Sequence, residues 1–157
     1  MSRRAIAAGG TTPLSAAIIR DGTIYVSGQV GRDPATGAVG EGIREQTRMV
    51  INNMRAVLRQ CGADLKDVDK CTVFITRQED FGAMNEVYAS MFPEPRPARS
   101  TIVVAALARN DFIVEIEGVV GRAGGGAAKP KATAKRAPRR ATRRPARAAR
   151  SRSARRR

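Results

Sequence analysis

The chain contains no histidine and no tryptophan, and only 4% of its 157 residues are aromatic. Without histidine there is neither a Ser-His nor a Cys-His nucleophile, and the commonest protein ligand for transition metals is missing. Hydrolytic triads and zinc sites are therefore disfavoured. Chemistry that relies on arginine and carboxylate side chains is favoured over both.

Long apolar segments are also missing. No segment approaches the roughly 20 consecutive apolar residues that a membrane-spanning helix needs, and residues 1–10 lack the apolar region of a signal peptide. We therefore expect a cytoplasmic protein with no membrane contact. Cys61 and Cys71 flank an expected turn. In a cytosolic chain we expect both to be reduced, partly buried thiols, and a disulfide between them is the alternative.

Acidic residues are absent from the C-terminal end. Residues 129–157 contain 14 of the 29 lysines and arginines and no acid, so that residues 1–128 carry a net charge of only +1. Large apolar residues are missing there too, and such a composition cannot offset the entropy lost on ordering. We predict one globular domain at 1–123, a Gly/Ala linker at 124–128 and a disordered Lys/Arg/Ala/Pro-rich basic tail at 129–157.

This basic tail is expected to bind nucleic acid without sequence specificity, because a dense polycation releases counterions from phosphates. Its composition resembles that of histone-like proteins and indicates a nucleoid association. It holds no aromatic residue, which argues against base stacking. A solubilising role and binding to an anionic membrane surface are the alternatives, and the choice between DNA and RNA stays open. The candidate nucleic-acid-binding residues are Arg139, Arg140, Arg143, Arg144 and Arg147.

Alternating strand and helix patterns predict an α+β fold. Asp21-Gly22 separates two β-rich segments and supplies the positive φ angles of a tight hairpin turn. Apolar residues at helical spacing precede Gly62, which is placed to end a helix in the left-handed conformation. We expect a mixed sheet with two crossover helices on one face, in the order β-β-α-β-α-β-β. The expected strands are 15–20, 23–29, 68–76, 100–107 and 112–120, and the expected helices are 42–60 and 79–91.

One arginine is placed where an anion would be needed. Arg99 follows the proline-rich segment 93–97 and precedes the apolar run 102–106, which reads as a buried strand. The planar donors of a guanidinium match a carboxylate in two parallel hydrogen bonds. The segment therefore indicates a site for a small carboxylic acid, with an ordinary surface arginine at a strand start as the alternative.

Four short motifs, taken in order, resemble the RidA/YjgF family of enamine/imine deaminases over about residues 5–122. They are Ser27-Gly28-Gln29, the Asn85 and Tyr88 of segment 80–88, Pro97-Ala98-Arg99-Ser100, and Val114-Glu115-Ile116-Glu117. The resemblance implies a chorismate-mutase-like fold and a homotrimer with a site in a cleft at each subunit interface. It also implies hydrolysis of 2-aminoacrylate and related 2-imino acids to 2-oxo acids and ammonia, with no metal or organic cofactor.

The same resemblance implies roles for individual residues. Arg99 binds the substrate carboxylate, and Glu115 positions the water and relays protons, which works best if partial burial raises its pKa toward neutrality. Glu117 points to the same face of the strand, since side chains repeat every second residue. A surface acid remains the alternative for Glu115.

Other residues carry weaker expectations. Ser27 and Gly28 are expected in the pocket wall, with an ordinary strand end as the alternative. Asn85 is expected to form a hydrogen bond in the interface site, and the alternative is that it is an ordinary capping or exposed helix residue. Phe81 and Tyr88 are assigned to core and interface packing.

Two positions depart from the family. Leu14 stands where many members have tyrosine, and Thr101 stands where a cysteine is often found. Both are expected to line the substrate site. We expect these two departures to affect the range of substrates and the rate of the reaction more than the type of reaction.

Three functions follow from these observations. The first is an imine deaminase whose tail localises it on DNA or RNA. The second is a nucleic-acid-binding, ribonuclease or translation-inhibitor protein that uses the body as a trimeric platform. The third is a ligand sensor without catalysis, although a sensor needs Arg99 and not Glu115.

Overall fold

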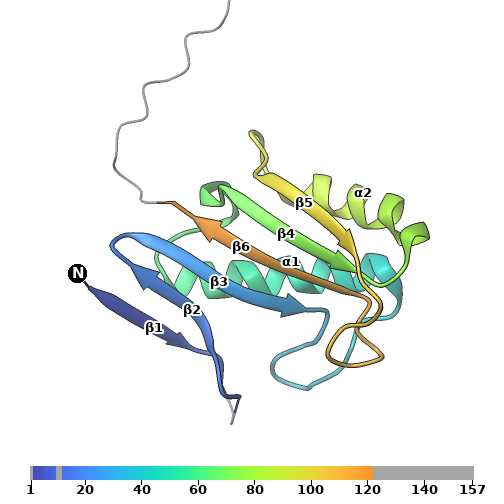
Figure 1. Ribbon diagram of the computed structural model, residues 1–157, viewed down its shortest axis with the longest axis horizontal. Coiled ribbons are helices and arrows are strands. Elements are labelled where there is room, and N and C mark those ends of the chain that lie inside the picture. Colours follow the sequence, from blue (N-terminus) through green and yellow to red (C-terminus); the bar gives the residue numbers. More distant parts are fainter. Residues whose placement is uncertain (1, 10–11, 122–157) are drawn as a thin grey trace, which may run out of the picture. The chain divides into compact units, whose positions relative to one another are not determined.

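The computed structural model describes residues 2–9 and 12–121 (Figure 1), and the predicted linker and basic tail lie outside them. Six strands form one mixed sheet in the order β1-β2-β3-β6-β4-β5. Both helices, α1 and α2, cover the same face of this sheet, as Figure 1 shows. We call this the helix face and its opposite the open face. Within the described residues, no helix is long and apolar enough to cross a bilayer.

The first half of the sheet is a hairpin, as the Asp21-Gly22 turn predicts. Strands β2 (Ser15–Arg20) and β3 (Thr23–Val30) pair antiparallel, and Asp21 and Gly22 have φ angles of 50° and 87°. These are values that a two-residue turn of this kind requires. The sequence did not predict β1 (Arg3–Ala7), which pairs with β2 at the edge of the sheet.

Helix α1 (Gly42–Gln60) has the predicted bounds. Its apolar positions are buried against β3 and β6, and Met54 and Leu58 are wholly inaccessible to solvent. The chain leaves the helix through Gly62, whose φ of 85° lies in the left-handed region, and the N–H of Ala63 donates a hydrogen bond back to the carbonyl of Leu58. The sequence pattern therefore places α1 correctly from start to finish.

Helix α2 (Phe81–Met91) begins two residues later than predicted, because Gln78–Asp80 form a short 3-10 helix first. The carboxylate of Asp80 is almost buried and accepts two hydrogen bonds from the Arg77 guanidinium. This pair ties the 3-10 turn to the start of the helix. The last turn of α2 ends at Phe92, whose ring stacks on that of Tyr88.

The connections place the C-terminal strand in the middle of the sheet. Strand β6 (Val114–Val120) pairs antiparallel with β3 on one side and with β4 (Lys70–Ile75) on the other. Helix α1 therefore carries the chain from β3 to β4 across the position of β6. Helix α2 then joins β4 to β5 (Ala98–Val103), which pairs with β4 in parallel. Both helices are crossovers, as predicted.

The expectation of a buried strand after Arg99 is wrong. Strand β5 spans 98–103 rather than 100–107, and it lies at the edge of the sheet with Ile102 and Val103 exposed by 44% and 51%. An apolar run suggests burial, but β5 has a neighbouring strand on one side only. Both cysteines are free thiols, with Cys71 buried and Cys61 partly buried.

A single buried amide joins two loops to the core, and its replacement is expected to destabilise the fold. Gln46 on α1 donates hydrogen bonds to the carbonyls of Gly40 and Asp111 and accepts one from the N–H of Ile113. Gln46→Met leaves these backbone groups unpaired, so we expect a loss of about 2–4 kcal/mol in the free energy of unfolding. Urea unfolding measures it, with exposed Gln60→Met as control. Equal midpoints for the two variants would contradict this role.

Candidate active site

Arg99 lies on the helix face of β5, held between that strand and α2. Its partner in the parallel register is Cys71, whose side chain is buried under the helices. The guanidinium carbon lies 4.6 Å from the centre of the Tyr88 ring and 5.9 Å from that of Phe81. Within the described residues, no carboxylate forms an ion pair with Arg99 and no group accepts a hydrogen bond from its guanidinium. Its donors are free to bind an anion.

A hollow of about 440 Å³ on the same face shares Phe81 with the surroundings of this arginine. It is lined by Ile75, Gln78, Phe81, Thr101 and Val103. The Thr101 hydroxyl is buried and has no hydrogen-bond partner within the described part of the chain. A buried hydroxyl without a partner is unfavourable, so this atom is suited to a polar group of a ligand. Asn85 is exposed on α2, one turn beyond Phe81.

Glu115 lies on the open face of β6, half-buried. Burial, and then the neighbouring charge of Glu117, raise the pKa of the Glu115 carboxyl above its usual value. Gly28 makes room for this carboxyl, because a Cβ atom there would lie 1.8 Å from Glu115 Oε1. The direction of this pKa shift suits a carboxyl that exchanges protons with a substrate.

Two further predicted residues lie near Gly28. Leu14, 54% exposed, and Gly28 line one cleft of about 350 Å³ that also includes Asn53 of α1. The Ser27 hydroxyl donates a hydrogen bond of 2.7 Å to the carbonyl of Ser15. The Ser27 hydrogen is therefore used within the sheet, and only the lone pairs of its oxygen are available to a ligand.

Arg99 and Glu115 lie on opposite faces of one sheet. Arg99 is level with Cys71 of β4, and Glu115 is level with Phe74 of the same strand. Side chains alternate along a strand, so positions 71 and 74 face opposite sides. The sheet therefore separates the guanidinium from the carboxyl, and a small molecule cannot contact both within one chain.

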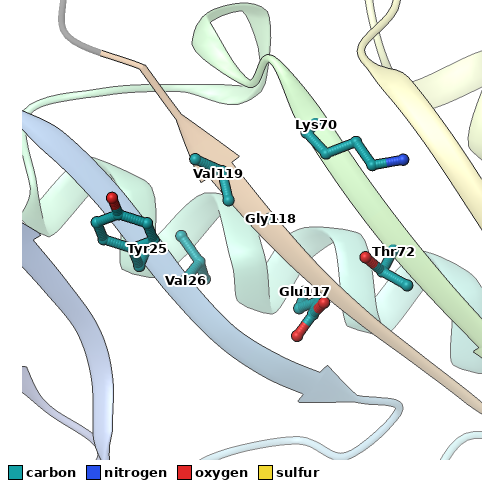
Figure 2. A pocket seen from close by; sticks show the side chains of 7 residues that line it. All are labelled: Tyr25, Val26, Lys70, Thr72, Glu117, Gly118 and Val119. Atoms are coloured by element: carbon teal, nitrogen blue, oxygen red, sulfur yellow. The ribbon is translucent and has the colours of Figure 1, made fainter.

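The open face is hollowed beside Glu117. Tyr25, Lys70, Thr72, Glu117 and Val119 are among the residues that line a depression of about 220 Å³. Figure 2 shows Tyr25, Thr72 and Glu117 on the three central strands, with α1 behind the sheet. Tyr25 is 51% exposed there, although it is a large aromatic residue. The face that carries Glu115 is thus free of any covering element among the described residues.

The described residues contain no group of three or more histidine, cysteine, aspartate or glutamate side chains that is arranged to hold a metal ion.

The family model described as Endoribonuclease L-PSP matches residues 4–121. The chain belongs to this family. A RutC family protein of Pyrococcus abyssi is 44% identical over 108 residues, which cover 68% of this chain and 84% of that protein. The human protein named 2-iminobutanoate/2-iminopropanoate deaminase is 40% identical over 114 residues, covering 72% and 82%. The crystal structure of E. coli TdcF with bound serine has a TM-score of 0.69 and 33% identity, covering 73% of this chain and 92% of that one.

The resemblance to the RidA/YjgF family is thereby confirmed, together with the fold that it implies. The roles of the site residues stay predictions. Within one chain of this family member, Arg99 and Thr101 lie on the same face of β5, and Glu115 lies beside Gly28 on the opposite face of the sheet. From the sequence, Tyr88 is assigned to packing and is not connected with Arg99; its spacing from Phe81, two turns along α2, is the available signal.

A methyl group at Gly28 is expected to impair this family's chemistry without unfolding the chain. Gly28→Ala displaces the Glu115 carboxyl, which sits at the end of a side chain that can rotate away. We expect kcat to fall by about tenfold to a hundredfold, as for a misplaced acid-base group. Gly82→Ala is the matched control, since a Cβ atom there meets nothing within 4 Å. Imine hydrolysis by both variants checks this, and equal rates would contradict it.

Proposed function

We propose that this chain is an enamine/imine deaminase that hydrolyses 2-imino acids to 2-oxo acids and ammonia. The observation that carries the proposal is Arg99, a partly buried cation held by two aromatic rings with its donors unpaired within the described residues. Such an arginine suits a carboxylate. The name of the human relative and the serine bound to TdcF, an amino acid with a carboxylate, support this substrate class.

The chemistry requires little beyond these groups. Arg99 binds the carboxylate beside the C=N bond, and a water molecule adds to the imine carbon. Glu115 takes a proton from that water and delivers it to the nitrogen, which gives a carbinolamine. It then moves the proton of the carbinolamine hydroxyl to the amino group, so that the C=O bond forms as the C–N bond breaks and ammonia leaves. A raised pKa fits this exchange, because it makes the carboxylate a stronger base that can hold the proton and then return it. Thr101, Asn85, Ser27 and Leu14 surround the substrate in this proposal.

We further propose that the active unit is a homotrimer with its sites between subunits. Arg99 and Glu115 occupy opposite faces, so each site takes the guanidinium from one chain and the carboxyl from the next. Such a head-to-tail interface closes into a ring. The exposed apolar side chains are suited to this interface because their burial is favourable. They are Leu14, Tyr25, Phe81, Ile102 and Val103.

The tail adds a second, independent proposal. Arg139, Arg140, Arg143, Arg144 and Arg147 lie outside the described residues, and their assignment to nucleic-acid binding rests on charge density alone. Binding of the tail to nucleic acid would place the deaminase in the cytoplasm at the nucleoid. The family description as an endoribonuclease favours the alternative in which nucleic acid is the object of the activity, with the body as a trimeric platform. A ligand sensor without catalysis is the third possibility.

A trapping assay tests the deaminase. An amino-acid oxidase generates 2-imino acids with a range of side chains, and semicarbazide traps those that remain. We expect the intact protein and a chain that ends at Gly126 to suppress trapping equally. If the intact protein leaves trapping unchanged for every side chain, the deaminase proposal fails, and the tail becomes the function to pursue.

Binding to duplex DNA and to RNA at several salt concentrations tests the tail. We compare the intact chain with one in which the five named arginines are glutamine. Each arginine that no longer neutralises a phosphate is expected to reduce the salt-dependence slope of log K by about 0.9 for DNA. Equal affinities and slopes for the two chains would remove the nucleic-acid proposal and leave the deaminase proposal intact.

A further inference from the structure

We propose that Tyr88 is a positioning residue for Arg99, and that the face of its ring, not its hydroxyl, does this work. The inference rests on the proposed function, because it assigns Arg99 to the substrate carboxylate. It adds the element that holds the guanidinium in place. From the sequence alone, Tyr88 has a packing role only.

The first argument is the way in which Arg99 is held. Carboxylates commonly fix a partly buried arginine in proteins, but within the described residues none pairs with Arg99. The Tyr88 ring, 4.6 Å from the guanidinium carbon, is the nearer of its two aromatic neighbours. A ring face attracts a cation without using its N–H donors. A carboxylate in that place would occupy the donors that a substrate needs.

The second argument is the rigidity of Tyr88 itself. Its side chain is only 3% exposed, and its ring stacks on Phe92 with centres 4.3 Å apart and planes inclined by 27°. Phe81, by contrast, is 43% exposed and lies further from the guanidinium. Tyr88 is therefore the fixed surface against which the arginine rests, and Phe81 is its second, more exposed aromatic neighbour.

The third argument concerns the Tyr88 hydroxyl. It is buried and has no hydrogen bond of ordinary geometry to any described residue. Burial, and then the neighbouring Cys71 thiol, raise the pKa of Tyr88 well above its usual value, so it stays neutral. The Tyr88 hydroxyl therefore holds Arg99 neither by a charge nor by a strong hydrogen bond. The aromatic ring is the part of the side chain that holds the guanidinium.

The test compares Tyr88→Phe with Tyr88→Leu in the intact chain. Two quantities are measured: the proton chemical shift of Arg99 Nε–H, assigned by its loss in Arg99→Lys, and the steady-state constants for imine hydrolysis. Tyr88→Phe keeps the ring, so we expect the shift to stay and KM to change by less than about twofold. Tyr88→Leu is expected to lose the ring-current shift and to raise KM by about five- to thirtyfold, with a smaller change in kcat.

Further variants separate positioning from general packing. Tyr88→Met fills the space without a ring face and repeats the test if Tyr88→Leu does not fold. Phe112→Leu removes a similarly buried ring from another arginine, because Phe112 lies 4.9 Å from the Arg109 guanidinium, which is paired with Asp111. It is expected to leave KM unchanged.

Two outcomes would overturn the inference. One is a folded Tyr88→Leu or Tyr88→Met protein with an unchanged Arg99 signal and KM. The other is a Tyr88→Phe protein as impaired as these, which would assign the role to the hydroxyl. If the intact protein hydrolyses no imine while its Arg99 signal still depends on the Tyr88 ring, the proposed function fails and the stacking stands.

Discussion

Replacing Arg99 by alanine is expected to lower kcat/KM for 2-imino acids by about 30- to 1000-fold, the usual effect of truncating one partner of a buried, hydrogen-bonded charge pair. Within the described residues, the guanidinium donors of Arg99 are unpaired, so its truncation leaves the substrate carboxylate without the partner proposed for it. Arg99→Lys keeps the charge but loses the two parallel hydrogen bonds. We therefore expect it to restore only part of the rate.

The matched control for this prediction is Arg109→Ala. Arg109 also lies over an aromatic ring, but Asp111 neutralises it. We expect this variant to retain the rate of the intact protein. The measurement is semicarbazide trapping with both variants, alongside a thermal unfolding curve to show that they fold. A folded Arg99→Ala protein with undiminished kcat/KM would exclude Arg99 from the site.

Mixing two inactive variants is expected to restore activity. The relative gain is large because each variant alone has almost no activity. Arg99→Ala keeps Glu115, and Glu115→Gln keeps Arg99. If each site takes one group from each of two chains, random assembly from equal amounts gives intact sites in about a quarter of the positions. The reason is geometric: the sheet separates the two side chains within one chain.

The experiment unfolds the two variants together in urea, refolds them, and compares the rate with that of the separately refolded proteins. Mixing Arg99→Ala with the double variant Arg99→Ala, Glu115→Gln is the control, since no chain then supplies the arginine. A mixture no more active than its components would show that both groups act within one chain, or that Glu115 is dispensable.

Local rules account for the parts of the fold that the sequence predicted well. Asp21-Gly22 defines its hairpin because few residues tolerate the turn's positive φ angles, and Gly62 ends α1 for the same reason. The apolar stripe of α1 is buried where its period places it. These features depend on residues close together in the chain.

The failures concern tertiary position. The apolar run 102–106 is of a kind that an inner strand would also have, but β5 ends at Val103 and strand order decides that it lies at the edge. Strand β1 was missed because Arg3 and Arg4 interrupt its apolar pattern and only pairing with β2 fixes it. Propensity cannot determine which strand lies beside which.

The sequence named candidate site residues, whose roles stay predictions, and it did not reveal how one chain arranges them. The pKa of Glu115 is raised by burial, in the direction that the sequence analysis asked for, and secondly by the charge of Glu117. That Arg99 and Glu115 face opposite sides follows from the register of β4 with its two neighbours. Register depends on pairing between distant segments, so the motifs alone could not reveal it.

The central place of β6 also has a mechanical consequence. The C-terminal segment continues from this strand, which is bonded to β3 and β4 along both edges, and the residue that follows it, Gly121, donates its N–H to the Asp69 carboxylate. A pull on that segment along the strand loads these hydrogen bonds in shear, because antiparallel bonds lie perpendicular to the strand axis. Many must then break together. The segment that follows β6 is thus attached to a strand that is paired along both edges, and a force on it would not peel the sheet open from an edge strand.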